Sequence, residues 1–184
     1  MTYVDDTNTR QAADAASKFV SWYYSQINEG KGVSQSYVTN NDTYKNAGHP
    51  PADICVNGLV CPTPEEWEKI LAQQREAPKA TNDKKHVSYV VDTFDAHVIN
   101  ADYRFGATQN LIDIHGPNDG VRMMIMVNVS GTVYFGVSKR SNEEYSVKQH
   151  FNDVFILVPN WDSLAKQSKY GKRFLIASQT YRAY

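Results

Sequence analysis

The chain has 184 residues, of which 41% are hydrophobic and 21% are charged, and its formal net charge at pH 7 is -1. This length suits one domain with a substantial core, and 12 tyrosines, 7 phenylalanines and 3 tryptophans exclude an intrinsically disordered chain. A charge near zero argues against an autonomous nucleic-acid binder, because such proteins carry a strongly basic face. We predict a single domain over residues 1–184.

The sequence shows no targeting, membrane or metal-binding signal. The N-terminal stretch MTYVDDTNTRQ has neither the basic nor the apolar segment of a secretory signal, and the apolar run MMIMVNVSGTVYF is too short and too interrupted to span a bilayer. We therefore expect an intracellular protein without membrane contact. In a reducing compartment Cys55 and Cys61 are expected to stay as packed thiols, and without paired histidines they predict no zinc site. We expect no cofactor.

The N-terminal half predicts helices and one hairpin. From Thr9 to Asn28 apolar residues recur at spacings of three, four and seven, and the glycines of EGKG follow, so this segment is predicted to be an amphipathic helix. The Asn57-Gly58 dipeptide between two short apolar runs predicts a hairpin, because a type I′ turn needs positive φ at both central residues. The next segment, PTPEEWEKILAQQ, opens with a capping box and predicts a second helix.

The C-terminal half predicts long strands over Val87–Ile99, Val121–Phe135, Val147–Val158 and Tyr170–Tyr184. Helices and a hairpin followed by a meander of antiparallel strands predict an α+β fold, with one strongly curved sheet packed on the N-terminal helices. The loop at about 100–120 is longer than a hairpin needs, and long ordered loops are often functional.

Both faces of the predicted sheet carry apolar residues. In the strand 121–135 the odd-numbered residues are almost wholly apolar and should face the helices, while the even-numbered ones form a mixed surface that includes Met124 and Met126. The next strand places Val154 and Ile156 on this second face. The chain has too little helix to cover both faces, and an exposed apolar patch usually marks a protein partner. The alternative is that the loops at 100–120 and 136–146 close the second face.

The strand VSYVVDTFDAH carries two aspartates and a histidine. Strict alternation places Val90, Asp92 and Phe94 on the second face, and it places Asp95 and His97 on the face toward the helices. Two explanations follow for the ionisable groups. Asp95 and His97 could act as acid and base in an enzyme pocket, or an aspartate could anchor another protein through an ion pair.

Several segments together resemble a known family. QAADAASKFVSWYY, VNGLV, VSYVVDTFDAHV, VSGTVYF, HFNDVFILVP and RFLIASQTYRAY are similar, in order and spacing, to the small subunits of the messenger-RNA export heterodimer. Those proteins belong to the nuclear transport factor 2-like superfamily. The resemblance spans nearly the whole chain and is closer to the fungal form, whose loops are extended. It implies a nuclear transport factor 2-like cone, in which a curved antiparallel sheet packs on N-terminal helices.

The resemblance also implies a function. Such a subunit is a non-catalytic adaptor that pairs, through the exposed sheet face, with the similarly folded domain of the large messenger-RNA export receptor. The pair contacts phenylalanine-glycine nucleoporins and supports export of mRNA, and of ribosomal subunits, from the nucleus through the nuclear pore, with RNA contacted only indirectly or weakly. The family has an aspartate in the motif VVD that meets an arginine of the partner, and this role maps onto Asp92.

The residues predicted to bind the partner are Asp92, Val90, Phe94, Met124, Met126, Val154, Ile156, Leu175 and Tyr181. Two other functions stay open. One is a lyase or isomerase of the same fold that uses Asp95 and His97, because relatives of this fold include such enzymes. The other is a homodimeric nuclear import factor.

Two further groups of residues have simpler interpretations. Lys166, Lys169, Lys172 and Arg173 form a basic cluster that we interpret as a solvated loop, with weak phosphate contact as the alternative. Trp161 is expected to fold back as a hydrophobic anchor, and Trp22 and Trp67 are expected in the core.

Overall fold

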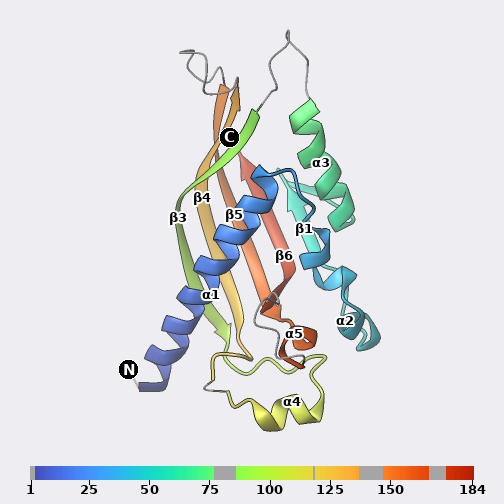
Figure 1. Ribbon diagram of the computed structural model, residues 1–184, viewed down its shortest axis with the longest axis vertical. Coiled ribbons are helices and arrows are strands. Elements are labelled where there is room, and N and C mark those ends of the chain that lie inside the picture. Colours follow the sequence, from blue (N-terminus) through green and yellow to red (C-terminus); the bar gives the residue numbers. More distant parts are fainter. Residues whose placement is uncertain (1–2, 77–85, 118, 137–146, 166–172) are drawn as a thin grey trace.

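The computed structural model describes residues 3–76, 86–117, 119–136, 147–165 and 173–184 (Figure 1). The helices are α1 (Tyr3–Asn28), α2 (Asp42–Asn46), α3 (Pro64–Glu76), α4 (Gln109–Ile114) and α5 (Trp161–Ala165), with short 3₁₀ helices η1 (Ser34–Ser36) and η2 (Val38–Asn40). The strands are β1 (Asp53–Val56), β2 (Leu59–Val60), β3 (His86–Asn100), β4 (Met124–Gly136), β5 (Val147–Pro159) and β6 (Phe174–Ala183). The predicted α+β class, first helix, hairpin and four long strands are confirmed.

The six strands form one sheet in the order β2-β1-β6-β5-β4-β3. The four long strands pair antiparallel, as predicted, and β1 pairs antiparallel with β2. The sheet is nevertheless mixed, because β1 runs parallel to β6. The hairpin from the N-terminal half thereby extends the sheet beyond the C-terminal strand.

Helices α1 and α3 lie over the same face of the sheet, which we call the inner face; the opposite one is the outer face (Figure 1). Phe19 of α1 packs edge-on against Phe155 of β5, with ring centroids 5.0 Å apart. Trp67 of α3 donates from Nε1 to the hydroxyl of Tyr23 in α1 at 2.9 Å. These contacts tie both helices to one side, as the amphipathic pattern of α1 requires.

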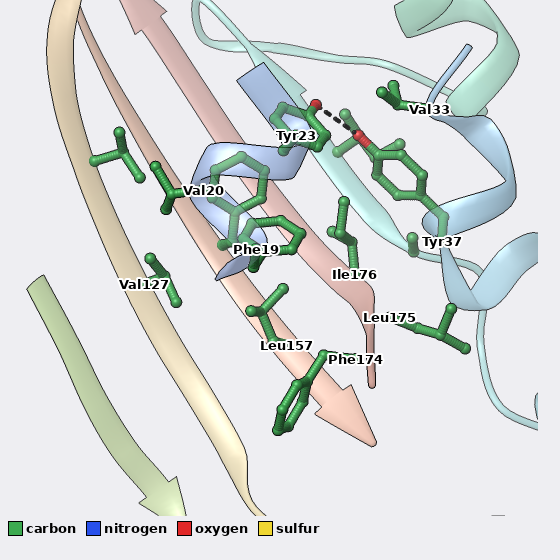
Figure 2. Packing of buried hydrophobic residues seen from close by; sticks show 14 of the residues in the cluster. Phe19, Val20, Tyr23, Val33, Tyr37, Val127, Leu157, Phe174, Leu175 and Ile176 are labelled. Carbon is green, nitrogen blue, oxygen red and sulfur yellow. Dashed lines mark hydrogen bonds between the residues drawn. The ribbon is translucent and has the colours of Figure 1, made fainter. Parts of the chain in front are cut away.

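The inner face carries the hydrophobic core, part of which Figure 2 shows. The odd-numbered residues of β4 that face it, Ile125, Val127, Val129 and Val133, are all 0% exposed, which confirms their predicted orientation. Each such side chain stabilises the fold by about 1.5–3 kcal/mol. Trp67 is buried as predicted, and Trp22 packs partly buried against the core.

The polar connections contain helices that the sequence did not indicate. Helix α2 begins after Asn41, whose Oδ1 accepts from the backbone N–H of Tyr44 at 3.0 Å. Such a local side-chain cap stabilises a short helix within this polar, Asn-rich segment.

The extended loop at about 100–120 contains α4, and two contacts hold its first residues. Arg122 Nη2 lies 2.6 Å from Asp102 Oδ1. Trp161 Nε1 donates to the carbonyl of Phe105 at 2.8 Å, and Trp161 is 2% exposed, so its predicted anchoring role is confirmed. The loop therefore packs on α5 at one end of the sheet (Figure 1).

Candidate functional site

Strand β3 contains one extra residue at Asp92. Val91 lies opposite Gly131 of β4 and Thr93 lies opposite Ser130, so Asp92 is inserted between two consecutive pairs. Successive side chains of a strand point to opposite faces, and an inserted residue moves every following side chain to the other face. The strict alternation expected along this strand therefore fails beyond Asp92.

Gly131 allows the two strands to approach at this bulge. A Cβ atom on Gly131 would lie 2.3 Å from the carbonyl oxygen of Val90 and 2.6 Å from a ring carbon of Phe151. Both distances are far below van der Waals contact, so a larger residue would force the backbone of β3 to move. Glycine inside a strand often marks such a bulge or close approach.

The bulge places Asp95 and His97 on the outer face. Asp95 lies opposite Asn128 and His97 lies opposite Met126, both of which are even-numbered outer residues of β4. His97 Nε2 is 3.1 Å from Asp95 Oδ2, and the two side chains are 57% and 73% exposed respectively. The expectation that they face the helices is wrong, because it counted alternation through an inserted residue.

Phe94 is moved the other way. It lies opposite Val129 on the inner face, and with Val20 and Tyr24 of α1 it lines an open groove of about 550 Å³. The prediction that Phe94 shares the outer face with Val90 is therefore wrong, for the same reason.

Leu175 and Tyr181 of β6 are also wrongly predicted to contact a partner, Tyr181 because it faces the core and Leu175 because the chain buries it. Tyr181 lies opposite Asp153 and packs against Trp67, with ring centroids 5.2 Å apart, so it belongs to the core. Leu175 is 2% exposed opposite the fully buried Val158, and Figure 2 shows it among the buried hydrophobic residues. Neither side chain is available to a partner, because the chain itself already buries both.

The other six predicted partner-binding residues lie on the outer face; they are Val90, Asp92, Met124, Met126, Val154 and Ile156. Met126 of β4 lies directly opposite Ile156 of β5. Met124 and Val154 are each two residues away on the same face, so Met124, Met126, Val154 and Ile156 form one contiguous apolar patch. All four are partly exposed, and Val90 is 44% exposed.

Polar side chains occupy the outer face beside the apolar patch. Asn152 Nδ2 donates to Asn128 Oδ1 at 2.6 Å. Thr132, which is only 5% exposed, donates to Asp92 Oδ2 at 3.3 Å and lies 3.4 Å from Nδ1 of His150. The outer face thus combines an apolar patch with hydrogen-bonding groups, which is the composition of a protein interface.

A second polar cluster lies inside the core, around Asp153. The Asp153 carboxyl is 1% exposed and accepts from Gln179 Nε2 at 2.9 Å and from the Tyr24 hydroxyl at 3.0 Å. Burial is the main cause that raises the pKa of Asp153 to about 8, although both hydrogen bonds oppose the shift. Tyr37 donates its hydroxyl hydrogen to Gln179 Oε1, and the Tyr23 hydroxyl lies 3.2 Å from both Gln179 Oε1 and the Tyr37 hydroxyl, to either of which it can donate its one hydrogen (Figure 2).

The Asp153 cluster was missed by sequence reasoning, although a signal exists. Asp153 occupies the inner-face position between Phe151 and Phe155, where alternation calls for an apolar residue. An acid at such a position is either solvated or enclosed by donors, and here it is enclosed. The cluster is closed to solvent, so it stabilises and orders the core.

Neither metal ligation nor membrane insertion is indicated by the part of the chain that the structure describes. Within the described ranges, His, Cys, Asp and Glu side chains form no group of three that could hold a metal ion. Over those same ranges, no helix combines the length with the apolar character that crossing a bilayer requires. Of the basic cluster, Lys166, Lys169 and Lys172 lie outside the described residues, and Arg173 is exposed.

Comparisons with known proteins place the chain in a family. No protein-family model and no curated protein sequence matches it. Solved structures do match: "Sac3N peptide bound to Mex67:Mtr2" contains a chain with 58% identity and a TM-score of 0.87. "Structure of Mtr2" matches with 56% identity and a TM-score of 0.85. The third, "Chaetomium thermophilum Mex67 NTF2-like domain complexed with Mtr2", matches with 57% identity and a TM-score of 0.84.

Each of these matches covers 95% of this chain and 99% of the matched chain. The mixed six-stranded sheet packed with N-terminal helices is the NTF2-like fold of these neighbours, which confirms the predicted fold. Identity this high over almost the full length of both chains means that the chain belongs to the Mtr2 family.

Proposed function

We propose that this chain is the non-catalytic small subunit of an mRNA export heterodimer and that its outer face binds the NTF2-like domain of a Mex67 protein. The observation that carries the proposal is the apolar patch of Met124, Met126, Val154 and Ile156, which stays partly exposed in the isolated chain. Similar chains have been solved together with a Mex67 NTF2-like domain, and one such pair also binds a Sac3N peptide.

Asp92 is suited to anchor this contact. It is exposed, and among the described residues its hydrogen bond comes from the Thr132 hydroxyl, which donates to Oδ2 at 3.3 Å. A guanidinium group from the partner would bind both carboxylate oxygens, and such charge-assisted pairs are about twice as strong as neutral hydrogen bonds. Desolvation on binding would make the pair selective for a basic partner residue.

The outer-face pair of Asp95 and His97 supports binding rather than catalysis. Both side chains are more than half exposed, whereas general acids and bases act in pockets that enclose the substrate. We further propose that the heterodimer, rather than this chain alone, contacts nucleoporins and RNA in the nucleus and at the nuclear pore.

The test is binding of the Mex67 NTF2-like domain from the same organism to the Asp92→Arg variant. We expect a loss of about 2–5 kcal/mol, or roughly 30-fold to several thousand-fold in Kd, because the partner arginine would meet a like charge. Asp14→Arg is the matched control, since Asp14 is an exposed aspartate on α1, which lies over the inner face (Figure 1).

A second variant tests whether the apolar patch, and not only Asp92, contacts the Mex67 domain. Ile156→Glu introduces a charge into the apolar patch and should also abolish binding while thermal unfolding stays cooperative. If both Asp92→Arg and Ile156→Glu bind the Mex67 domain normally, the outer face is not the interface. A wild-type chain that forms a stable homodimer in light scattering, and ignores the Mex67 domain, would favour the import-factor alternative.

A further inference from the structure

The outer face does not end at β6. Thr180 of β6 lies opposite Val154 of β5 on one side and opposite Cys55 of β1 on the other. Cys55 in turn lies opposite Val60 of β2. Directly opposed residues of neighbouring strands share a face, so Val60 and Cys55 continue the outer face onto the hairpin.

One row of side chains therefore crosses the whole sheet; it consists of Asp95, Asn128, Val154, Thr180, Cys55 and Val60. Neighbouring strands are about 4.8 Å apart, so the row spans roughly 24 Å. The centre of the apolar patch, between β4 and β5, lies about 12 Å from Cys55 and about 17 Å from Val60 along this row. Permanent hetero-complexes cover about 1,000–2,500 Å² on each partner, which is roughly 32–50 Å across. A partner of this class centred on the patch would therefore cover Cys55 and, over most of this size range, Val60.

The hairpin presents Val60 on a rigid support. Asn57, with φ of 52°, and Gly58, with φ of 84°, form its turn. The backbone N–H of Asn57 donates to the backbone carbonyl of Tyr181 at 2.8 Å, and Asn57 Oδ1 accepts from the backbone N–H of Ala183 at 2.8 Å. Val60 itself is 79% exposed. An apolar contact held in place before binding loses little conformational entropy on binding.

We propose that the β1–β2 hairpin is part of the surface that binds the Mex67 NTF2-like domain, with Val60 and Cys55 meeting an uncharged, apolar part of that domain. This inference rests on the proposed function and adds a contact beyond the residues predicted from the sequence. The row includes Val154 of the apolar patch, so the protein that binds the patch would also contact the hairpin. We therefore assign the contact with the hairpin to the Mex67 NTF2-like domain.

Leu59 provides a matched control within the same hairpin. It is 74% exposed, close to the value for Val60, but it lies opposite Val56, which lies opposite the inner-face residue Tyr181. Its side chain therefore points to the other side of the sheet. Val60→Asp and Leu59→Asp each introduce one negative charge, at neighbouring exposed positions that lie on opposite faces of the sheet.

We expect Val60→Asp to weaken binding of the Mex67 domain by roughly ten-fold or more, because the interface would bury an unpaired carboxylate. Leu59→Asp should change the Kd by less than about two-fold, as exposed substitutions away from an interface do. Equal Kd values for the two variants would overturn the inference. The melting temperatures of both variants should match that of the wild type, since neither side chain is buried.

Alkylation of Cys55 gives an independent readout without changing the chain. Cys55 is partly exposed, whereas Cys61 is 5% exposed and burial raises the pKa of its thiol, so Cys61 should react slowly in every state. Binding of the Mex67 domain should slow maleimide labelling of Cys55 roughly five-fold or more because the complex excludes solvent there. An unchanged labelling rate in the saturated complex would contradict the inference.

The two proposals fail in different ways. Loss of binding by Asp92→Arg and Ile156→Glu, together with normal binding by Val60→Asp, would remove the hairpin from the interface and leave the proposed function intact. Normal binding by all three variants would overturn both.

Discussion

The hydroxyl of Thr132 donates to the carboxylate of Asp92 across 3.3 Å on the outer face of the sheet. The bond is long, and Thr132 is almost completely buried beneath it, so it orients the carboxylate without competing strongly for it. Asp92 is itself the inserted residue of the bulge in β3.

The Asp92→Asn variant tests the charge separately from the shape. The amide keeps an acceptor for Thr132 and removes the charge, so we expect the Kd for the Mex67 domain to rise roughly ten-fold or more. Its salt dependence should also become shallower, because an ion pair is screened and a neutral contact is not. Isothermal titration calorimetry at low and high salt measures both effects.

Asp14→Asn is the control for that experiment, since Asp14 is 59% exposed on α1, which lies over the inner face and not the outer one (Figure 1). Its removal should change the Kd by less than about three-fold. An Asp92→Asn variant that keeps wild-type affinity and salt dependence would show that no partner cation meets Asp92.

The sequence indicated the strands of this site but not the faces of all their side chains. Alternation is counted along one strand, and each bulge shifts the count by one without changing the composition. The bulge at Asp92 moved Phe94, Asp95 and His97 to the faces opposite to those predicted. One sequence signal of the bulge was Gly131 on the neighbouring strand, because a glycine inside an apolar strand often marks a bulge.

A similar limit explains the error on Tyr181 of β6. The pairing shifts between Ile156 and Leu157, because Ile156 lies opposite Ser178 and Leu157 lies opposite Ile176. Which residues of β6 face the core thus depends on a pairing with β5 that the sequence of β6 alone does not specify. Leu175 precedes the shift and lies opposite Val158, and the sequence did not predict that the chain buries both residues. In contrast, the residues of β4 were placed correctly, because their apolar alternation continues through most of the strand.

Gly131→Ala should destabilise the fold. The added methyl would lie 2.3 Å from the backbone carbonyl of Val90, so β3 must move or lose its bulge. We expect the free energy of unfolding to fall by about 1–3 kcal/mol or more. Urea denaturation followed by circular dichroism measures the change.

Gly116→Ala is the matched control, since a Cβ atom there meets only Asp119, at an ordinary distance of 3.7 Å. That substitution should leave stability within about 0.5 kcal/mol. If Gly131→Ala is equally neutral, the close approach of β3 and β4 does not exist in solution.

Asn57→Ala should weaken the hairpin on two counts. Asn57 adopts a φ of 52°, which alanine disfavours, and its Oδ1 accepts the N–H of Ala183 at 2.8 Å. Together these changes should cost about 1–3 kcal/mol of unfolding free energy. Asn46→Ala, at an exposed helical position, should cost less than about 0.5 kcal/mol. Similar midpoints for both variants in urea would exclude a strained turn.

The buried Asp153 makes stability depend on pH in an unusual direction for an aspartate. Its pKa is about 8 in the folded chain, against an ordinary value of 3.8, so the folded state holds a proton that the unfolded state releases. The contribution of Asp153 to the free energy of unfolding is therefore largest below about pH 4, and it is lost as the pH rises toward 8. The slope is at most about 1.4 kcal/mol per pH unit.

Asp153→Asn should remove this slope. The amide cannot ionise and keeps one oxygen to accept from Gln179 or Tyr24, although the loss of the second acceptor shifts stability at every pH by about 1 kcal/mol. The free energy of unfolding in urea, measured at pH 5, 6, 7 and 8, should fall with pH more steeply in the wild type than in the variant. Asp42→Asn, whose side chain is 89% exposed, should follow the wild-type curve. Parallel curves for wild type and Asp153→Asn would mean that Asp153 is ionised in the folded chain, and the core would then have to stabilise a buried negative charge through its hydrogen bonds alone.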